Sequence, residues 1–281
     1  DCRRACLGVL LAGWIMAVPV ALRGQGREAR PKRVGTAKFT DKKIVVDGVL
    51  DDAAWADSDL FEGFTQKEPE DGKPATEKTE VRILYNKEFL YFAAYCHDSV
   101  PNGYIINDIG RDFDIQEQDY FALVLDTFND DRNGYYLGTT VEGNQRDIQF
   151  TDEGRNQNVN WDAVWYSQGH RVEDGYTVEI AVPFKTLRFS KDKQQVWGLQ
   201  LVRRIRRRNE VVFWSPISRR YTGITAVALA GELQGIEDVE PGRNLQIKPY
   251  GLAGVKHWPP AGEETKGDFN AGGDLKYGVT P

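Results

Sequence analysis

Two kinds of side chain in this sequence could together hold a ligand: polar groups in one long loop and aromatic rings beside another. The polar loop carries Arg111, Asp112 and Gln116, and long loops on a rigid β scaffold often carry function. Trp214 and Tyr221 border a second loop, where an aromatic face could stack on a ligand while polar groups fix its orientation. The alternative, a solvated loop beside two packed rings, stays open.

Oxygen-bearing side chains could also bind a hard cation. Asp126 begins a stretch containing Asn129, Asp130 and Asp131, whose oxygens Ca²⁺ would accept. Asp98 is a second calcium candidate. The spacing matches no EF-hand, and Asx turns explain the stretch more simply. We therefore expect no cofactor, with structural calcium at Asp98 or Asp126 as the alternative.

The sequence shows no residue grouping typical of an enzyme. His97, His170 and His257 are scattered, without a Ser/His/Asp grouping or an H-E-x-x-H motif. A glycosidase carboxylate pair cannot be found in one sequence, because any two of the 42 acidic residues could meet in space. We predict no catalytic residue. Gln200 joins the polar candidates for ligand binding.

Composition excludes one class of partner and supports a globular fold. The 281 residues carry a net charge of -6 and a pI near 5.3, whereas nucleic-acid binding needs a basic face. Hydrophobic residues make up 41%, enough for a full core. Of the three cysteines, only Cys96 lies beyond the N-terminal segment, and we interpret it as a small core residue.

The N-terminal segment has the pattern of a targeting signal. Arg3 and Arg4 precede an apolar stretch over 5–22, which favours a secretory signal peptide over 1–25. A signal anchor is the alternative, although the stretch is short for a membrane span. We expect a flexible lead-in over 26–40 and an exported protein, located in the periplasm, the outer membrane or outside the cell.

The elements that would position these residues are short strands. Residues 79–98 alternate with a period of two around the polar break 86–88, as in a β-hairpin. Its second strand is apolar on both faces and so needs a second layer. Turn signals recur about every ten residues, which predicts an all-β fold, an antiparallel, jelly-roll-like β-sandwich over 41–238. Further strands are predicted over 42–46, 119–126, 135–141, 145–150, 163–171, 175–182, 196–205, 211–214 and 227–233, with 244–255 and 268–277 opening a second β domain over 244–281.

An ordered series of motifs supports a family resemblance. The motifs lie at 44–55, 79–85, 90–93, 161–165, 175–184 and 197–198. Together, from about 42 to 235, they resemble the family 9 carbohydrate-binding module. Motifs at 188–189, 203–207, 209–210 and 213–214, with 244–250 and 272–277, look like bacterial outer-membrane proteins of unknown function, in which such a module precedes a large β-barrel. That resemblance implies a barrel whose first strands lie in 244–281.

The resemblance implies a site that clamps a terminal sugar between two Trp. Here Gln116 occupies the place of the first Trp, Tyr221 lies near that of the second, and Ala122 and Leu137 replace an acidic residue and an Arg. The resemblance thus implies binding to oligo- or polysaccharide ends and a link to carbohydrate catabolism, and a glycoside hydrolase acting on O-glycosyl bonds if an enzyme is attached. The substitutions favour the alternative, a cap domain of a membrane barrel that binds no sugar.

Overall fold

The structure is a computed structural model that describes residues 32–221, 223–242, 245–257 and 265–277. The expected signal peptide over 1–25 lies outside the described residues. Inside them, strands alternate with loops and short 3₁₀ turns, which confirms the all-β prediction. In this described part, no helix has both the length and the apolar character needed to span a membrane. The 3₁₀ turns are η1 (Ala53–Asp57), η2 (Phe184–Thr186), η3 (Arg206–Arg208) and η4 (Val227–Leu229).

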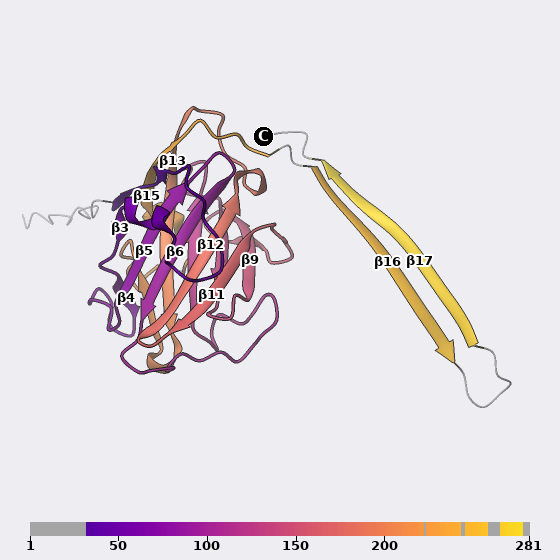
Figure 1. Cartoon of the computed structure of the whole chain (residues 1–281), viewed down its shortest axis with the longest axis horizontal. Coiled ribbons are helices and arrows are strands. Elements are labelled where there is room, and N and C mark those ends of the chain that lie inside the picture. Colours follow the sequence, from indigo (N-terminus) through magenta and orange to yellow (C-terminus); the bar gives the residue numbers. More distant parts are fainter. Residues whose placement is uncertain (1–31, 222, 243–244, 258–264, 278–281) are drawn as a thin grey trace, which may run out of the picture. The chain divides into compact units, whose positions relative to one another are not determined.

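The strands form two sheets whose pairing is mostly antiparallel (Figure 1). The described part of the first sheet has nine strands, in the order β1-β15-β13-β7-β8-β9-β10, with β14 paired to β13 and β4 paired to β14. Their bounds are β1 (Val34–Thr36), β4 (Thr65–Glu68), β7 (Tyr120–Asp126), β8 (Gly134–Thr139), β9 (Gln145–Thr151), β10 (Asn156–Asn158), β13 (Gln194–Ile205), β14 (Glu210–Phe213) and β15 (Gly231–Glu237).

The second sheet has six described strands in the order β11-β12-β6-β5-β2, with β3 paired to β5. The predicted hairpin over 79–98 becomes β5 and β6, and β12 pairs with β6 along nine residues. Figure 1 shows β5, β6, β12 and β11 running side by side. The bounds are β2 (Lys38–Phe39), β3 (Leu60–Phe61), β5 (Thr79–Tyr85), β6 (Phe89–His97), β11 (Tyr166–Val172) and β12 (Gly175–Pro183).

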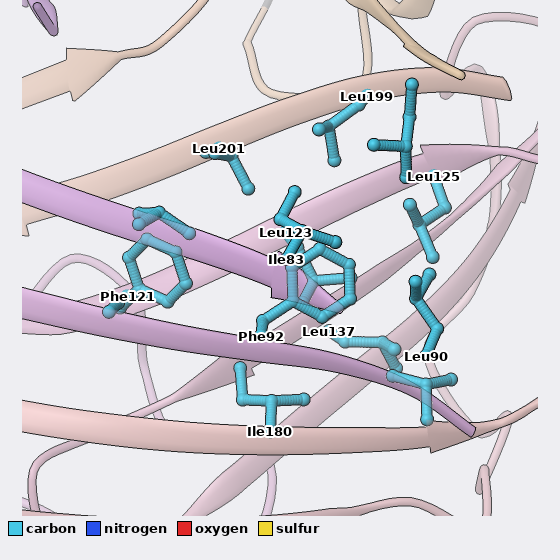
Figure 2. Close-up of a cluster of buried hydrophobic side chains, with 14 of the residues drawn as sticks. Ile83, Leu90, Phe92, Phe121, Leu123, Leu125, Leu137, Ile180, Leu199 and Leu201 are labelled. Atoms are coloured by element: carbon cyan, nitrogen blue, oxygen red, sulfur yellow. The ribbon is translucent and has the colours of Figure 1, made fainter. Parts of the chain in front are cut away.

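The main core lies between the two sheets because alternate side chains of each strand point inward. Ile83, Phe92 and Ile180 come from the six-stranded sheet and pack in one cluster with Leu123 and Leu201 from the other. Figure 2 shows these side chains pointing toward one another between the strands. Trp55, Trp165 and Trp197 are also buried. The β-sandwich expected from the sequence is therefore confirmed.

Two local predictions are wrong. Residues 34–39, expected within a flexible lead-in, form β1 and β2, which hydrogen-bond in parallel to β15 and β5. Edge strands of two or three residues carry too short a pattern to be recognised. Residues 42–46 form no strand. Instead Ile44 and Val46 pack on a separate apolar cluster over the outer face of the six-stranded sheet.

The C-terminal strands pair only with each other in the described residues. β16 (Leu245–His257) and β17 (Thr265–Tyr277) form an antiparallel hairpin. Alternation puts Ile247, Val255 and Phe269 on one face, and all three side chains are exposed. The expected strands thus exist, and the larger domain they were expected to open stays a prediction.

Candidate functional site

The long polar loop lies on the outer face of the nine-stranded sheet. Phe113, in that loop, is fully buried against Tyr120, Ala122 and Tyr136. These residues alternate with the inward-facing Phe121 on β7 and its neighbours in the main core. The sheet is therefore apolar on both faces, and the loop covers the outer one. We call this surface the roofed face, defined by Tyr120, Ala122, Tyr136, Gly138 and Arg146.

The strand register fixes how the roofed face is built. One row across the sheet runs Val202, Ala122, Gly138 and Arg146. Tyr136 lies two residues from Gly138 on β8 and extends over it, since a Cβ added to Gly138 would stand 2.5 Å from the Tyr136 hydroxyl oxygen. The lack of a side chain at Gly138 thus gives the Tyr136 ring its place.

Arginines fasten the loop to the sheet. Arg146 Nη1 donates hydrogen bonds to the carbonyl oxygens of Asp112, at 2.9 Å, and Phe113, at 2.7 Å. Arg204 Nη2 donates to the Gln116 carbonyl oxygen at 3.0 Å. Arg111 forms an ion pair with the buried Asp147 at 2.6 Å. Of the predicted loop candidates, Arg111 is thus a structural contact, whereas the Asp112 and Gln116 side chains are exposed.

A second loop covers the rest of the roofed face, and it separates the predicted aromatic pair. Tyr221 is half-buried and packs against the apolar cluster of this face. Trp214 is only 4% exposed and lies in the main core, with its ring centroid 5.2 Å from that of Phe61. Trp214, directly after β14, therefore packs toward the other sheet, apart from the apolar cluster that contains Tyr221.

Gln200 is likewise part of the interior. Its amide Nε2 donates to the Ser215 carbonyl oxygen at 2.8 Å, and its Oε1 accepts from the Ser215 backbone N–H at 2.9 Å. Buried polar groups are normally paired in this way. Gln200 thus holds the start of the second loop and does not reach the surface.

Burial dominates the electrostatics of the roofed face. It raises the pKa of Tyr120 to about 12 and that of Tyr136 well above its ordinary value. Among the residues that the structure describes, the Tyr136 hydroxyl and the Nε atoms of Arg146 and Arg204 are buried without a hydrogen-bond partner. Chemically, this face is a packed layer with a few unpaired polar atoms, and only its rim reaches solvent.

Asp119 connects the loop to the end of β13. Its Oδ2 accepts hydrogen bonds from the backbone N–H of Ile105, at 2.8 Å, and of Arg206, at 3.2 Å. Its Oδ1 has no hydrogen-bond partner within the described part of the chain. Burial raises the pKa of Asp119 to about 6, against the two hydrogen bonds that lower it. A carboxyl that titrates in this range makes the fastening of the loop sensitive to pH.

The two calcium candidates, Asp98 and Asp126, both make contacts within the protein. Asp98 is buried and paired with Arg207 at 2.5 Å, and its Oδ1 also accepts from the Val100 N–H. The Asp126 oxygens accept from the backbone N–H groups of Asp130 and Asp131, so positive ends of dipoles occupy the coordinating positions. No group of three or more metal-ligating side chains occurs among the described residues. Both aspartates thus make contacts within the protein, and a calcium ion at either one stays a prediction.

Sequence reasoning missed the residues that shape this face. Tyr136, Gly138 and Arg146 lie on predicted strands, and alternation over 145–150 places Arg146 on the same face as Ile148 and Phe150. That pattern was the available signal. An Arg in line with two buried apolar residues indicates a covered strand face.

Comparisons with known proteins agree with this architecture. Residues 46–209 match the model of a family described as "Carbohydrate family 9 binding domain-like". No match was found among the curated proteins. Among solved structures, a carbohydrate-binding module of family 9 from Caldicellulosiruptor kristjanssonii in complex with cellotriose is 14% identical, with a TM-score of 0.50, and the match covers 73% of this chain and 95% of that one.

Two further solved structures are similar to this chain. The same kind of module from Caldicellulosiruptor kristjanssonii in complex with glucose is 15% identical, with a TM-score of 0.50 and coverage of 75% and 97%. A protein of Bacteroides uniformis ATCC 8492 is 11% identical, with a TM-score of 0.56 and coverage of 75% and 100%. At these identities the likeness establishes the fold alone.

Proposed function

The chain belongs to the carbohydrate family 9 binding domain-like family, and from that premise we propose that its β-sandwich binds carbohydrate. The observation that carries the proposal is the extent of the match, which spans 46–209 and so includes β5 to β13 of both sheets. Solved modules with the same fold hold glucose and cellotriose. The role fits a module that holds a saccharide, with any chemistry performed elsewhere.

Isothermal titration calorimetry tests the proposal. The full chain is titrated with glucose, cellotriose and xylotriose, and we expect a saturable heat with at least one of them. Glycerol at matched concentration is the control for nonspecific heats of dilution. Absence of a saturable heat with every saccharide contradicts the proposed function.

The β16–β17 hairpin supports a second candidate function, a structural module attached to a membrane. Ile247, Val255 and Phe269 are exposed on one face of the hairpin, and Leu252 is exposed on the other face beside Asn270. Apolar side chains aligned on one face of a two-stranded sheet need a cover. Flotation of the chain with phospholipid vesicles tests this function, and replacing Val255 and Phe269 together with Asp should abolish co-flotation. Failure of the unmodified chain to float would exclude it.

We also propose that the protein is exported from the cytoplasm. The apolar stretch behind Arg3 and Arg4 supports secretion. A fusion of residues 1–40 to a reporter, expressed in a bacterium and fractionated, should place the reporter outside the cytoplasm. A matched fusion with Leu10 and Leu11 replaced by Asp should keep it inside. Equal cytoplasmic retention of both fusions would contradict export.

A further inference from the structure

The outer face of the six-stranded sheet contains a hollow of about 400 Å³. Its floor is the buried Ala93 on β6, whose small side chain leaves room above the sheet. We call it the β6 hollow. Ligand sites are typically clefts of roughly this size, with apolar walls and a few polar groups. Its lining includes Leu50, Asp51, Arg82, Ala93, Tyr95 and Thr177.

Tyr95 supplies a fixed aromatic face beside this floor. Its ring stacks on that of His97, with centroids 4.0 Å apart and planes inclined by 13°. His97 lies two residues beyond Tyr95 on the same face of β6 and Ala93 two residues before it, so the opposite ring face turns toward the hollow. The Tyr95 hydroxyl donates to Asp174 at 2.5 Å, which holds the ring in place.

The partner strands supply polar groups on either side of the ring. Arg82 pairs with Ala93 across β5 and β6. Its Nη1 makes contacts of 3.3 to 3.4 Å with the carbonyl oxygens of Trp55 and Ser58. Among the residues that the structure describes, Arg82 forms no ion pair with a carboxylate, so its guanidinium can donate to a ligand. Asp51, exposed at the rim, supplies an acceptor.

Hydrogen bonds to buried side chains hold the wall of the hollow in place. The buried carboxylate of Glu179 on β12 accepts from the N–H groups of Asp47 and Gly48, at 3.0 Å each, and from Trp55 Nε1 at 2.9 Å. The Thr177 hydroxyl donates to the Gly48 carbonyl oxygen at 2.6 Å. These contacts fix the segment that continues into Val49, Leu50 and Asp51, so the hollow exists before a ligand arrives.

We propose that the β6 hollow binds a single neutral sugar ring, stacked on Tyr95 and hydrogen-bonded by Arg82 and Asp51. The inference rests on the proposed carbohydrate binding and assigns it to the sheet opposite the roofed face. A pyranose has an apolar C–H face that suits an aromatic ring, and a rim of hydroxyls that suits one donor and one acceptor. The hollow has these three elements together, whereas the roofed face has its rings covered.

Titration of three hollow variants with glucose and cellotriose tests this site. Ala93→Leu fills the floor and should abolish binding. Tyr95→Ala removes the stacking face and should weaken binding about tenfold or more. Tyr95→Phe keeps the ring and should bind within about threefold of the unmodified chain. Circular dichroism and thermal unfolding establish that each variant is folded.

Gln116→Ala, on the rim of the opposite sheet, is the matched control and should bind normally. If the unmodified chain binds a sugar and both Ala93→Leu and Tyr95→Ala bind it equally well, the β6 hollow is not the site, while the proposed function stands. If the unmodified chain binds no sugar, both fail. Should Ala93→Leu not fold, Tyr95→Ala compared with Tyr95→Phe decides alone.

Discussion

The outer faces of the two sheets differ in how they are covered. On the nine-stranded sheet, two long loops cover Tyr120, Tyr136 and Phe150 completely. On the six-stranded sheet, the segment before β3 covers only part of the face, with Trp55 packed on Tyr91 and Ala181. The β6 hollow lies on the part of that face that this segment leaves uncovered.

The difference shows that the segments lying over each sheet decide which outer face stays open to solvent. The family's resemblance directs attention to Gln116 and Tyr221, at the rim of the roofed face. There the structure supplies packed rings and arginines bonded to loop carbonyls. The β6 hollow instead supplies an open aromatic face. Substitutions on each face can establish whether the loops over the roofed face stay closed and whether the β6 hollow binds the sugar.

The largest effect is expected from removing the roof's central side chain. Phe113→Ala should lower the free energy of unfolding by about 3–5 kcal/mol, because it leaves a cavity under a fully covered loop. Urea unfolding measures the change. Ile109→Ala, in the same loop but 84% exposed, is the control and should change stability by less than about 0.5 kcal/mol. If Phe113→Ala lowers the free energy of unfolding by less than about 1 kcal/mol, the loop over the roofed face is not held closed by Phe113.

The free energy of unfolding should depend on pH through Asp119, which fastens the loop over the roofed face. Because burial raises the pKa of Asp119 from 3.8 to about 6, the folded state binds the proton more tightly than the unfolded state. Proton binding at Asp119 therefore stabilises the folded state fully below pH about 3.8, and this stabilisation is lost as pH rises through about 6. Asp119→Asn removes this loss, which amounts to roughly 3 kcal/mol.

Urea unfolding at several pH values between 4 and 7, a range set about the Asp119 pKa of about 6, measures this effect. The unmodified chain should lose stability relative to Asp119→Asn as pH rises. Asp112→Asn, an exposed side chain of the same loop, is the control and should leave the profile unchanged. Parallel profiles for Asp119→Asn and the unmodified chain would contradict the prediction.

A smaller effect is expected where the wall of the hollow is anchored. Glu179→Gln replaces one acceptor oxygen by an amide donor, so at least one of the N–H groups of Asp47, Gly48 or Trp55 loses its partner. We expect a loss of about 1–3 kcal/mol in stability together with weaker sugar binding. Thermal unfolding and calorimetry measure the two effects. Glu173→Gln, exposed in the adjoining turn, is the control. If Glu179→Gln is less stable but binds sugar as tightly as the unmodified chain, the wall of the hollow plays no part in sugar binding.

The sequence predicts the scaffold better than the site for a physical reason. The alternation over 79–97 depends on neighbours along the chain, and it correctly predicts β5 and β6. The roof depends on contacts such as that between Arg146 and the Asp112 carbonyl, 34 residues apart. The hollow depends on Asp51, Arg82, Tyr95 and Thr177 meeting from four segments. These contacts join residues far apart in the sequence, so no local sequence pattern predicts them.

The smallest effect on stability is expected from substitutions at the rim of the roofed face. Their effect on sugar affinity distinguishes most sharply between the two candidate binding faces. The Gln116 side chain is exposed, and only its backbone carbonyl contacts Arg204. Gln116→Trp restores the aromatic residue that the family resemblance implies, and it should change stability by less than about 0.5 kcal/mol. If sugar binds in the β6 hollow, calorimetry should give the same affinity for Gln116→Trp, Gln116→Ala and the unmodified chain. If Gln116→Trp binds sugar more tightly than the unmodified chain and Gln116→Ala does not, the saccharide binds at the rim beside Tyr221. The hollow would then have no part in sugar binding.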